Sequence, residues 1–340
     1  MKSWISKIRR TRDRRIRLER DGDIIGSMEW AEYLCGWYDD VSDFEATPDG
    51  GLRFKKLGVA LPKEQVRILL GRNKNYGYCL DLKKAGVSFE PASDGVLLRH
   101  GRLAFCIGSS VELFILWELL CRHSYRYVLP PGRQVIFDIG MNVGLASLVL
   151  ADRNPQALVC GFEPFPSTFG RLEKNLELNP DMARRITAYP YALADRDACE
   201  TWKLGVENCG SSSQFADALF GRVEDVPIKV RKASATMSDF LSQHPQSDYC
   251  VVKMDCEGGE YAIMRDWAAS GLAQKIDLIL MEYHEVAGHN ATELQAWFQD
   301  NGFSAVVLPA PPEVGLHIGM IYAYRSPSYV RHAPQPHSGN

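Results

Sequence analysis

Residues 132–325 alternate short apolar runs with segments of helical period. An apolar run without polar alternation is typical of a strand buried on both faces, and helices between such strands cover both sides of a parallel sheet. The pattern therefore predicts a doubly wound α/β fold with a mostly parallel, seven-stranded sheet. The predicted strands are residues 135–137, 158–160, 186–189, 250–252, 278–280, 305–307 and 318–322.

The sequence pattern divides the chain into four regions. We expect a basic arm over residues 1–24 and an accessory α+β region over residues 25–130, with helices near 28–38, 61–72 and 111–123 and short strands near 87–89, 96–98 and 103–105. The main α/β domain occupies residues 131–325, with an insertion at 199–236 where the alternation breaks. Residues 326–340 form a polar, Pro-rich tail that we expect to be disordered.

The charge of the chain is uneven. Residues 1–20 carry nine Lys or Arg and two acids, and since the chain total is −3, the remaining residues carry −10. A mildly acidic body argues against a broad nucleic-acid-binding face. Two interpretations of the arm remain open: peripheral contact with an anionic membrane or another polyanion, or a solvated basic segment.

Nine scattered cysteines contain no C-x-x-C pair, which argues against a zinc or dithiol site and indicates reduced thiols. The basic N-terminus lacks the apolar core of a secretory signal, and no apolar run approaches the length of a membrane span. We therefore expect a cytoplasmic protein. The sequence does not indicate its oligomeric state.

The segment Asp138-Ile-Gly-Met-Asn-Val-Gly144 joins the first predicted strand to a helix, the position where open α/β sheets bind nucleotide-like cofactors. Asn142 stands where a dinucleotide motif has its second glycine, and no P-loop lysine follows Gly144. Glu163 ends the second strand, where an acid accepts hydrogen bonds from ribose hydroxyls of NAD or S-adenosylmethionine. Asp138 favours S-adenosylmethionine, because a carboxylate repels a pyrophosphate. The alternatives are a strand-end cap at Asp138 and a helix N-terminal acid at Glu163.

These motifs are followed by Phe162-Glu-Pro-Phe-Pro166, Asn175-Leu-Glu-Leu-Asn179 and Lys253-Met-Asp-Cys-Glu-Gly258. In order and spacing they resemble the FkbM family of S-adenosylmethionine-dependent methyltransferases over about residues 87–325. The family's typical members methylate hydroxyls of sugars, glycans or polyketide products. The resemblance implies that Asp138, Gly140, Asn142 and Gly144 shape the methionine pocket, that Glu163, followed by Pro164, holds the ribose, and that Ala192 and Leu193 lie beside the adenine.

Charged residues end the fourth and fifth predicted strands. Lys253, Asp255 and Glu257 alternate at the end of the fourth, and His284 ends the fifth. A hydroxyl needs a positioned base as the C–O bond forms, and histidine suits that role near neutral pH. We predict His284 as the base and Asp255, Lys253 and Glu257 as orienting or electrostatic groups. The alternatives are an internal ion pair at Lys253, with Asp255 or Glu260, and a structural hydrogen-bonded histidine at His284.

We assign no metal ligand as the first interpretation. Asp255, Glu282 and Glu285 nevertheless offer oxygen ligands with which Mg²⁺ would lower the pKa of an acceptor hydroxyl. The sequence thus leaves a magnesium site at these three residues as a second hypothesis.

The acceptor depends on loops whose conformation the sequence does not specify. We expect a small-molecule or carbohydrate acceptor, with a sugar, glycan or glycoconjugate hydroxyl first and a polyketide or other secondary-metabolite hydroxyl second. Trp202 and the segment 208–213 of the insertion suit a polyhydroxylated ligand. Two rival classes are an NAD-dependent dehydrogenase and a non-catalytic scaffold recruited by its basic arm.

Overall fold

The computed structural model describes residues 42–71, 75–205, 223–286, 288–309 and 317–325. The basic arm, the helix predicted near 28–38, the middle of the insertion and the tail lie outside these residues. The chain divides into two compact units, residues 1–101 with 106–117 and residues 102–105 with 118–340. Each unit is described by itself below.

The first unit is built from short strands and three described helices. Strands β1, β2 and β3 form an antiparallel meander, and β4 pairs with β5 in a hairpin. Phe44, Phe54 and Tyr76 bring their aromatic rings together in its core. The elements are β1 (Phe44–Ala46), β2 (Leu52–Phe54), β3 (Val59–Leu61), α3 (Lys63–Leu70), α4 (Asn75–Lys84), β4 (Ser88–Ala92), β5 (Gly95–His100) and α5 (Ser110–Trp117), while β6 (Leu103–Ile107) contributes residues to both units.

The second unit contains the predicted seven-stranded sheet, in the order β15-β16-β14-β13-β7-β8-β9. β16 is antiparallel to its neighbours β14 and β15, and the other described neighbours pair in parallel. All seven predicted strands are confirmed. Their bounds are β7 (Gln134–Ile139), β8 (Ala157–Phe162), β9 (Ile186–Tyr189), β13 (Tyr249–Met254), β14 (Leu278–His284), β15 (Phe303–Pro309) and β16 (Ile318–Arg325).

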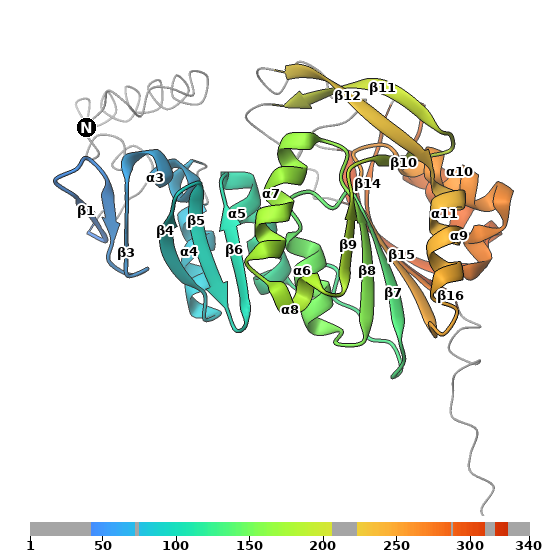
Figure 1. Cartoon of the computed structure of the whole chain (residues 1–340), viewed down its shortest axis with the longest axis horizontal. Coiled ribbons are helices and arrows are strands. Elements are labelled where there is room, and N and C mark those ends of the chain that lie inside the picture. The colour runs from blue at the N-terminus through green and yellow to red at the C-terminus, as the bar shows by residue number, and fades with distance from the viewer. Residues whose placement is uncertain (1–41, 72–74, 206–222, 287, 310–316, 326–340) are drawn as a thin grey trace, which may run out of the picture. The chain divides into compact units, whose positions relative to one another are not determined.

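Helices cover both faces of this sheet (Figure 1). Every residue of β7 and β13 is buried, which explains why these strands lack polar alternation. Alternate residues of the strands, among them Phe137 and Val252, share one core with Trp267 of α10 and Phe298 of α11. The helices are α6 (Leu145–Arg153), α7 (Pro166–Glu177) and α8 (Pro180–Ala183) on one side, and α9 (Ala233–Gln243), α10 (Glu260–Ser270) and α11 (Ala291–Asp300) on the other.

The unit also contains a small three-stranded sheet, to which the insertion contributes. β10 (Ala192–Ala194), β11 (Ala198–Gly205) and β12 (Val223–Lys232) pair in the order β10-β12-β11, with β11 and β12 antiparallel. Figure 1 shows this sheet above the edge where the central strands end. Residues 233–236, predicted as part of the insertion, begin α9 instead, because Ala233 and Met237 pack into the main core.

The helix predicted over 111–123 ends earlier than expected. α5 stops at Trp117, and Glu118–Arg122 form a π-helix, followed by left-handed backbone at His123 and Tyr125. Such turns are frequent at functional sites. Burial, with the nearby charge of Asp255, raises the pKa of Glu118 to about 7.

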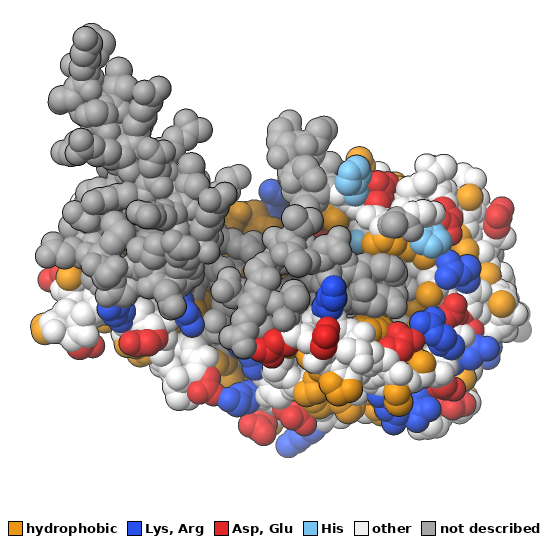
Figure 2. Space-filling view, turned by 90° about the horizontal axis from the view of Figure 1, so that it is seen from above, with side chains coloured by type: hydrophobic (Ala, Val, Ile, Leu, Met, Phe, Trp, Pro, Cys, Tyr) orange, Lys and Arg blue, Asp and Glu red, His pale blue; other side chains and the backbone are white. Residues whose placement is uncertain are grey.

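Charged side chains of both signs lie on the described surface. Figure 2 shows acidic and basic side chains interspersed over it in that view. No helix within the described residues combines the length and the apolar character needed to cross a membrane.

Candidate active site

The loop after β7 is held by backbone hydrogen bonds. Gly140 has φ of 80°, and a Cβ there would overlap the carbonyl oxygen of Asp255, so that only glycine fits. The amide of Met141 donates to the carbonyl of Phe162 at 2.9 Å, which ties this loop to the end of β8. The loop therefore runs directly between the ends of β13 and β8.

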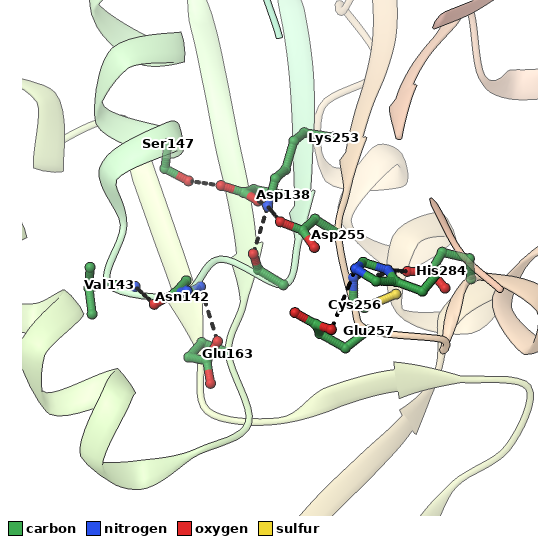
Figure 3. Close-up of polar contacts among 12 residues, drawn as sticks. Asp138, Asn142, Val143, Ser147, Glu163, Lys253, Asp255, Cys256, Glu257 and His284 are labelled. Atoms are coloured by element: carbon green, nitrogen blue, oxygen red, sulfur yellow. Dashed lines mark hydrogen bonds and ion pairs between the residues drawn. The ribbon is translucent and has the colours of Figure 1, made fainter. Parts of the chain in front are cut away.

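Glu163 lies at the end of β8 and is almost completely buried. Its carboxylate accepts hydrogen bonds from the backbone amides of Asn142 and Phe165, both at 3.0 Å. Burial is the largest influence and raises the pKa of Glu163 to about 7, against the two amides and the more distant Lys253, which lower it. Asn142 has left-handed backbone, with φ of 52°, and its side chain accepts from the amide of Val143. The turn thus aims an amide at the carboxylate (Figure 3).

A pocket opens beside this loop, along the ends of β7, β8 and β13. Its apolar lining includes Phe165 and Trp202, whose ring centroids lie 6.3 Å apart. The lining also includes the acidic residues Glu163, Asp255 and Glu257. The lining comprises Ile139, Gly140, Asn142, Phe162, Glu163, Pro164, Phe165, Ala192, Leu193, Trp202, Asp255, Cys256, Glu257 and Gly259.

Lys253 and Asp138 form a buried ion pair behind the pocket. The Lys253 Nζ lies 3.1 Å from Asp138 Oδ1 and 3.9 Å from Asp255 Oδ2, and it donates to the Gly140 carbonyl at 2.7 Å. Ser147 donates to the other Asp138 oxygen at 2.6 Å. Burial alone would lower the pKa of Lys253, but the charges of Asp138 and Asp255 raise it. Figure 3 shows this network spanning the cofactor loop and the end of β13.

His284 ends β14 among carboxylates. Its Nδ1 lies 3.2 Å from Glu260 Oε1 and its Nε2 lies 3.4 Å from Glu257 Oε2. Burial alone would lower the pKa of His284, but the hydrogen bond with Glu260 and the charges of Glu257, Glu260 and Asp255 raise it to about 10. Burial, with help from Asp255, also raises the pKa of Glu257 above its ordinary range, although His284 opposes the shift. The imidazole is therefore held in its protonated form near neutral pH.

The structure brings most of the predicted site residues to the pocket. Four of them do not line it. Gly144 precedes α6 in left-handed backbone and permits that helix to begin. His284 reaches the lining through Glu257. Asp138 pairs with Lys253 at 3.1 Å, a partner that the sequence did not suggest, whereas Asp255, one of the two suggested partners of Lys253, lies at 3.9 Å. The prediction that Asp138 shapes the methionine pocket stays a prediction. The predicted residues in the lining are Gly140, Asn142, Glu163, Pro164, Ala192, Leu193, Asp255 and Glu257.

The predicted magnesium set is only partly brought together. Burial is the largest influence that raises the pKa of Glu282, and the charge of Asp255 is the second, so these two carboxyl groups lie near one another. Glu285 instead accepts from the Ala291 amide and pairs with His317 at 3.0 Å. The structure groups Asp255 with Glu257 and His284, whose ligand atoms all lie within 4.8 Å of one another.

Three important residues were not singled out from the sequence pattern as site residues. Phe165 belongs to a quoted motif, but its position in the pocket wall depends on the turn into α7. Glu260 was considered only as a partner of Lys253, whereas its carboxylate contacts His284 and the Cys256 amide. Ser147 holds Asp138 from the first turn of α6. Its position in the first turn of the helix after the cofactor loop is the one signal that could have indicated Ser147.

A glycine-containing loop after the first strand, a buried acid after the second and charged groups after the fourth define a nucleotide-cofactor-binding enzyme of the doubly wound class. Residues 138–305 match the methyltransferase FkbM domain model. The chain is an S-adenosylmethionine-dependent methyltransferase of the FkbM type.

Curated relatives agree with this family. "Methyltransferase 1" of Beauveria bassiana is 27% identical over 225 residues, which cover 60% of this chain and 87% of that protein. "Methyltransferase sdnD" of Sordaria araneosa is 23% identical, with coverage of 62% and 95%. "31-O-demethyl-FK506 methyltransferase FkbM" of Streptomyces tacrolimicus is 25% identical, with coverage of 61% and 86%. All three are named methyltransferases.

Among solved structures, methyltransferase FkbM from Methylobacillus flagellatus KT matches with a TM-score of 0.38 and 15% identity, covering 75% of this chain and 60% of that one. A putative tRNA (m1A22) methyltransferase of Streptococcus pneumoniae in complex with S-adenosyl-L-methionine matches with a TM-score of 0.33 and 14% identity, covering 58% and 72%. Both likenesses are weak.

Proposed function

We propose that the protein is an O-methyltransferase whose acceptor is a hydroxyl of a sugar, glycan or glycoconjugate. One observation carries the proposal. A single pocket is lined by a buried ribose-type acid, Glu163, and by two partly exposed carboxylates, Asp255 and Glu257. The first suits the cofactor, and the other two suit an acceptor that offers hydroxyl groups.

The cofactor side fits S-adenosylmethionine, which supplies an electrophilic methyl group when bound. Among the described residues, no cationic side chain lies within ion-pair distance of Glu163, so its remaining lone pairs are available to hydroxyl donors. Phe165 and Leu193 offer apolar surface in the same pocket for a planar base. These residues would therefore bind S-adenosylmethionine through one charged contact, at Glu163, and through apolar surface.

The acceptor side must orient a hydroxyl and remove its proton as the new bond forms. The oxygens of Asp255 and Glu257 accept hydrogen bonds from such a hydroxyl at the pocket. His284 acts as the base only after it loses the proton that Glu257 and Glu260 favour. We therefore propose that the hydroxyl proton is lost at this cluster, with His284 positioned by Glu260.

Two observations support hydroxyl transfer and the acceptor class. The Streptomyces tacrolimicus relative is named for a 31-O-demethyl compound, which supports transfer to oxygen. Trp202 lines the same pocket as the carboxylates and donates from its ring nitrogen to Glu200 at 2.8 Å, which holds the indole in place. A fixed aromatic face next to hydrogen-bond acceptors suits a sugar ring.

Calorimetric titration of S-adenosylmethionine into the wild type and into Glu163→Gln tests the cofactor half. We expect binding by the wild type and a loss of about tenfold or more in the variant, since charge-assisted hydrogen bonds disappear. Glu173→Gln, at an exposed position of α7, is the matched control and should bind normally. Binding of NADH in place of S-adenosylmethionine would overturn the proposal.

Release of S-adenosylhomocysteine in the presence of candidate acceptors tests the acceptor half. We expect turnover with a sugar or glycan, and a loss of about 100-fold in kcat for Glu257→Gln with cofactor affinity retained. A panel of polyketide-type hydroxyls forms the comparison arm. Turnover with those compounds alone would reject the carbohydrate acceptor and leave O-methyl transfer standing.

A further inference from the structure

We propose that Asp255, Glu257 and His284 form a site for a first-row divalent cation of the Mn²⁺ type. Each residue offers one ligand atom, and the three atoms lie within 4.8 Å of one another. Two come from the turn between β13 and α10 and one from the end of the neighbouring strand β14. The set differs from the one suggested by sequence spacing, because Glu285 is engaged with His317.

The orientation of His284 supports a ligand at its Nε2. Its Nδ1 contacts Glu260, whose side chain is completely buried at the start of α10. When Nδ1 carries the proton and donates it to this carboxylate, Nε2 presents a lone pair toward Glu257, 3.4 Å away. Metal-binding histidines characteristically donate their other ring N–H to a carboxylate, which fixes the tautomer and the ring orientation. Because that lone pair would face the Glu257 carboxylate, a cation bound between the two groups, in place of the second ring proton, would relieve their repulsion.

The buried charge gives independent support. Glu260 Oε2 is buried and has no hydrogen-bond partner among the described residues. Glu282 and Glu118 add carboxylates close to Asp255. The nearby cation Lys253 is already paired with Asp138 at 3.1 Å. The cluster therefore gathers more carboxyl groups than cationic groups in a partly buried place, and a divalent cation would balance these groups in their ionised form.

The mixture of ligand atoms indicates the type of ion. Carboxylates suit Mg²⁺ and Mn²⁺, whereas an imidazole favours transition metals, so one nitrogen and two carboxylate oxygens together suit Mn²⁺ or Co²⁺. Three ligands leave open positions. Asp255 and Glu257 also line the pocket, so an ion held there can bind an acceptor oxygen.

The catalytic part of this inference rests on the proposed function. A bound cation lowers the pKa of the acceptor hydroxyl, which releases its proton to water. The oxygen pair then forms the O–C bond while the C–S bond breaks, and that electron pair stays on sulfur as a neutral thioether. This arrangement removes the need for a neutral His284 as base.

Titration with Mn²⁺, followed by calorimetry and by loss of the free-ion EPR signal, tests the site without cofactor or acceptor. We expect one ion per chain. His284→Gln and Glu257→Gln should each weaken binding by at least tenfold, and Glu260→Gln by about tenfold, the typical loss for a group behind a ligand. Co²⁺ should give a visible spectrum that changes in His284→Gln.

The matched control is His317→Gln, which removes an exposed histidine from a similar carboxylate pair and should leave binding unchanged. Because Glu257 is partly exposed, its variant tests the site even if Glu260→Gln does not fold. Absence of Mn²⁺ binding at millimolar concentration in a wild type that binds S-adenosylmethionine would overturn the site and leave the proposed function standing. Binding unaffected by His284→Gln, or lost in Glu285→Gln, would also overturn it. Mn²⁺ binding with the expected variant losses would support the site even if S-adenosylmethionine failed to bind.

Discussion

The two sides of the pocket are built in different ways. The cofactor side depends on backbone: the loop from Gly140 to Gly144 supplies amides and turns, and Glu163 is its single charge. The catalytic side depends on side chains, with Asp255, Glu257 and His284 converging from two strand ends. Backbone geometry that needs glycine leaves a clear trace in a sequence, whereas converging charges do so only when the fold is known.

Lys253 joins the two sides. It donates to the Gly140 carbonyl of the cofactor loop and pairs with Asp138 and Asp255. The Lys253 Nζ also lies 5.5 Å from the centroid of the Tyr125 ring, a cation–π contact that extends the network to the segment after the π-helix. The two sides therefore share one buried cation, and its removal is the most direct way to test whether they are independent.

The largest effect is expected for Lys253→Met. This change leaves the Asp138 carboxylate buried without its counter-ion, which should lower the free energy of unfolding by about 3–5 kcal/mol. Cofactor affinity should fall as well, because the Gly140 carbonyl loses its donor. Chemical denaturation and calorimetric titration measure the two effects.

The control for Lys253→Met is Lys84→Met, which removes an exposed partner of Asp81 and should change stability by less than about 1 kcal/mol. Adding Asp138→Asn to Lys253→Met should recover part of the lost stability, since the uncompensated charge is then removed. A Lys253→Met protein as stable as the control would show that the buried pair does not stabilise the fold, and unchanged S-adenosylmethionine affinity would show that Lys253 does not couple the two sides.

The next largest effect is expected for Gly140→Ala. The new methyl group would collide with the Asp255 carbonyl, and alanine disfavours the left-handed backbone that this position requires. We expect a loss of about 2–4 kcal/mol in unfolding free energy and of cofactor binding beyond detection. Differential scanning calorimetry, with and without S-adenosylmethionine, measures both.

Gly170→Ala provides the opposite case. Gly170 lies within α7, and a Cβ there meets no atom within 4 Å. Alanine should stabilise the helix by about 0.5–1 kcal/mol and leave binding unchanged. Equal stability and equal cofactor binding in the two glycine variants would show that the protein does not depend on the close approach of Gly140 to the Asp255 carbonyl.

The same contrast explains what the sequence could predict. Apolar runs predicted all seven strands of the sheet. Burial on both faces imposes that composition on β7 and β13, whereas β15 and β16 carry apolar residues although they are partly exposed. The glycines and Glu163 were predicted because they stand at fixed positions relative to strand ends. The split of the 111–123 helix was missed, since a π-helix differs from an α-helix by one hydrogen-bond register and no residue type marks it.

The catalytic side was predicted less completely. Strand order places β13 beside β7 and β14, but it does not specify whether Lys253 turns toward Asp138 or toward the pocket. Ser147 and the Gly140 carbonyl determine that choice, and both are tertiary neighbours. Glu285 follows His284 in the sequence, whereas Glu257 is distant in the sequence. It is nevertheless Glu257, in left-handed backbone, whose carboxylate lies at the imidazole.

The smallest effect is expected from the pH dependence of Glu163→Gln, which tests the single charge on the cofactor side. The pKa of Glu163 is about 7 in the folded protein, against 4.5 in an exposed chain, so the folded state binds more protons between these values. Ionisation of the buried carboxylate therefore lowers the unfolding free energy of the wild type as pH rises from about 5 to 7. The loss should be about 1–3 kcal/mol and complete above pH 7. Glu163→Gln should lack this loss, because its amide does not ionise, whereas Glu173→Gln should retain it. Urea denaturation at several pH values measures the difference, and parallel curves for wild type and Glu163→Gln would show that the carboxylate carries no buried charge.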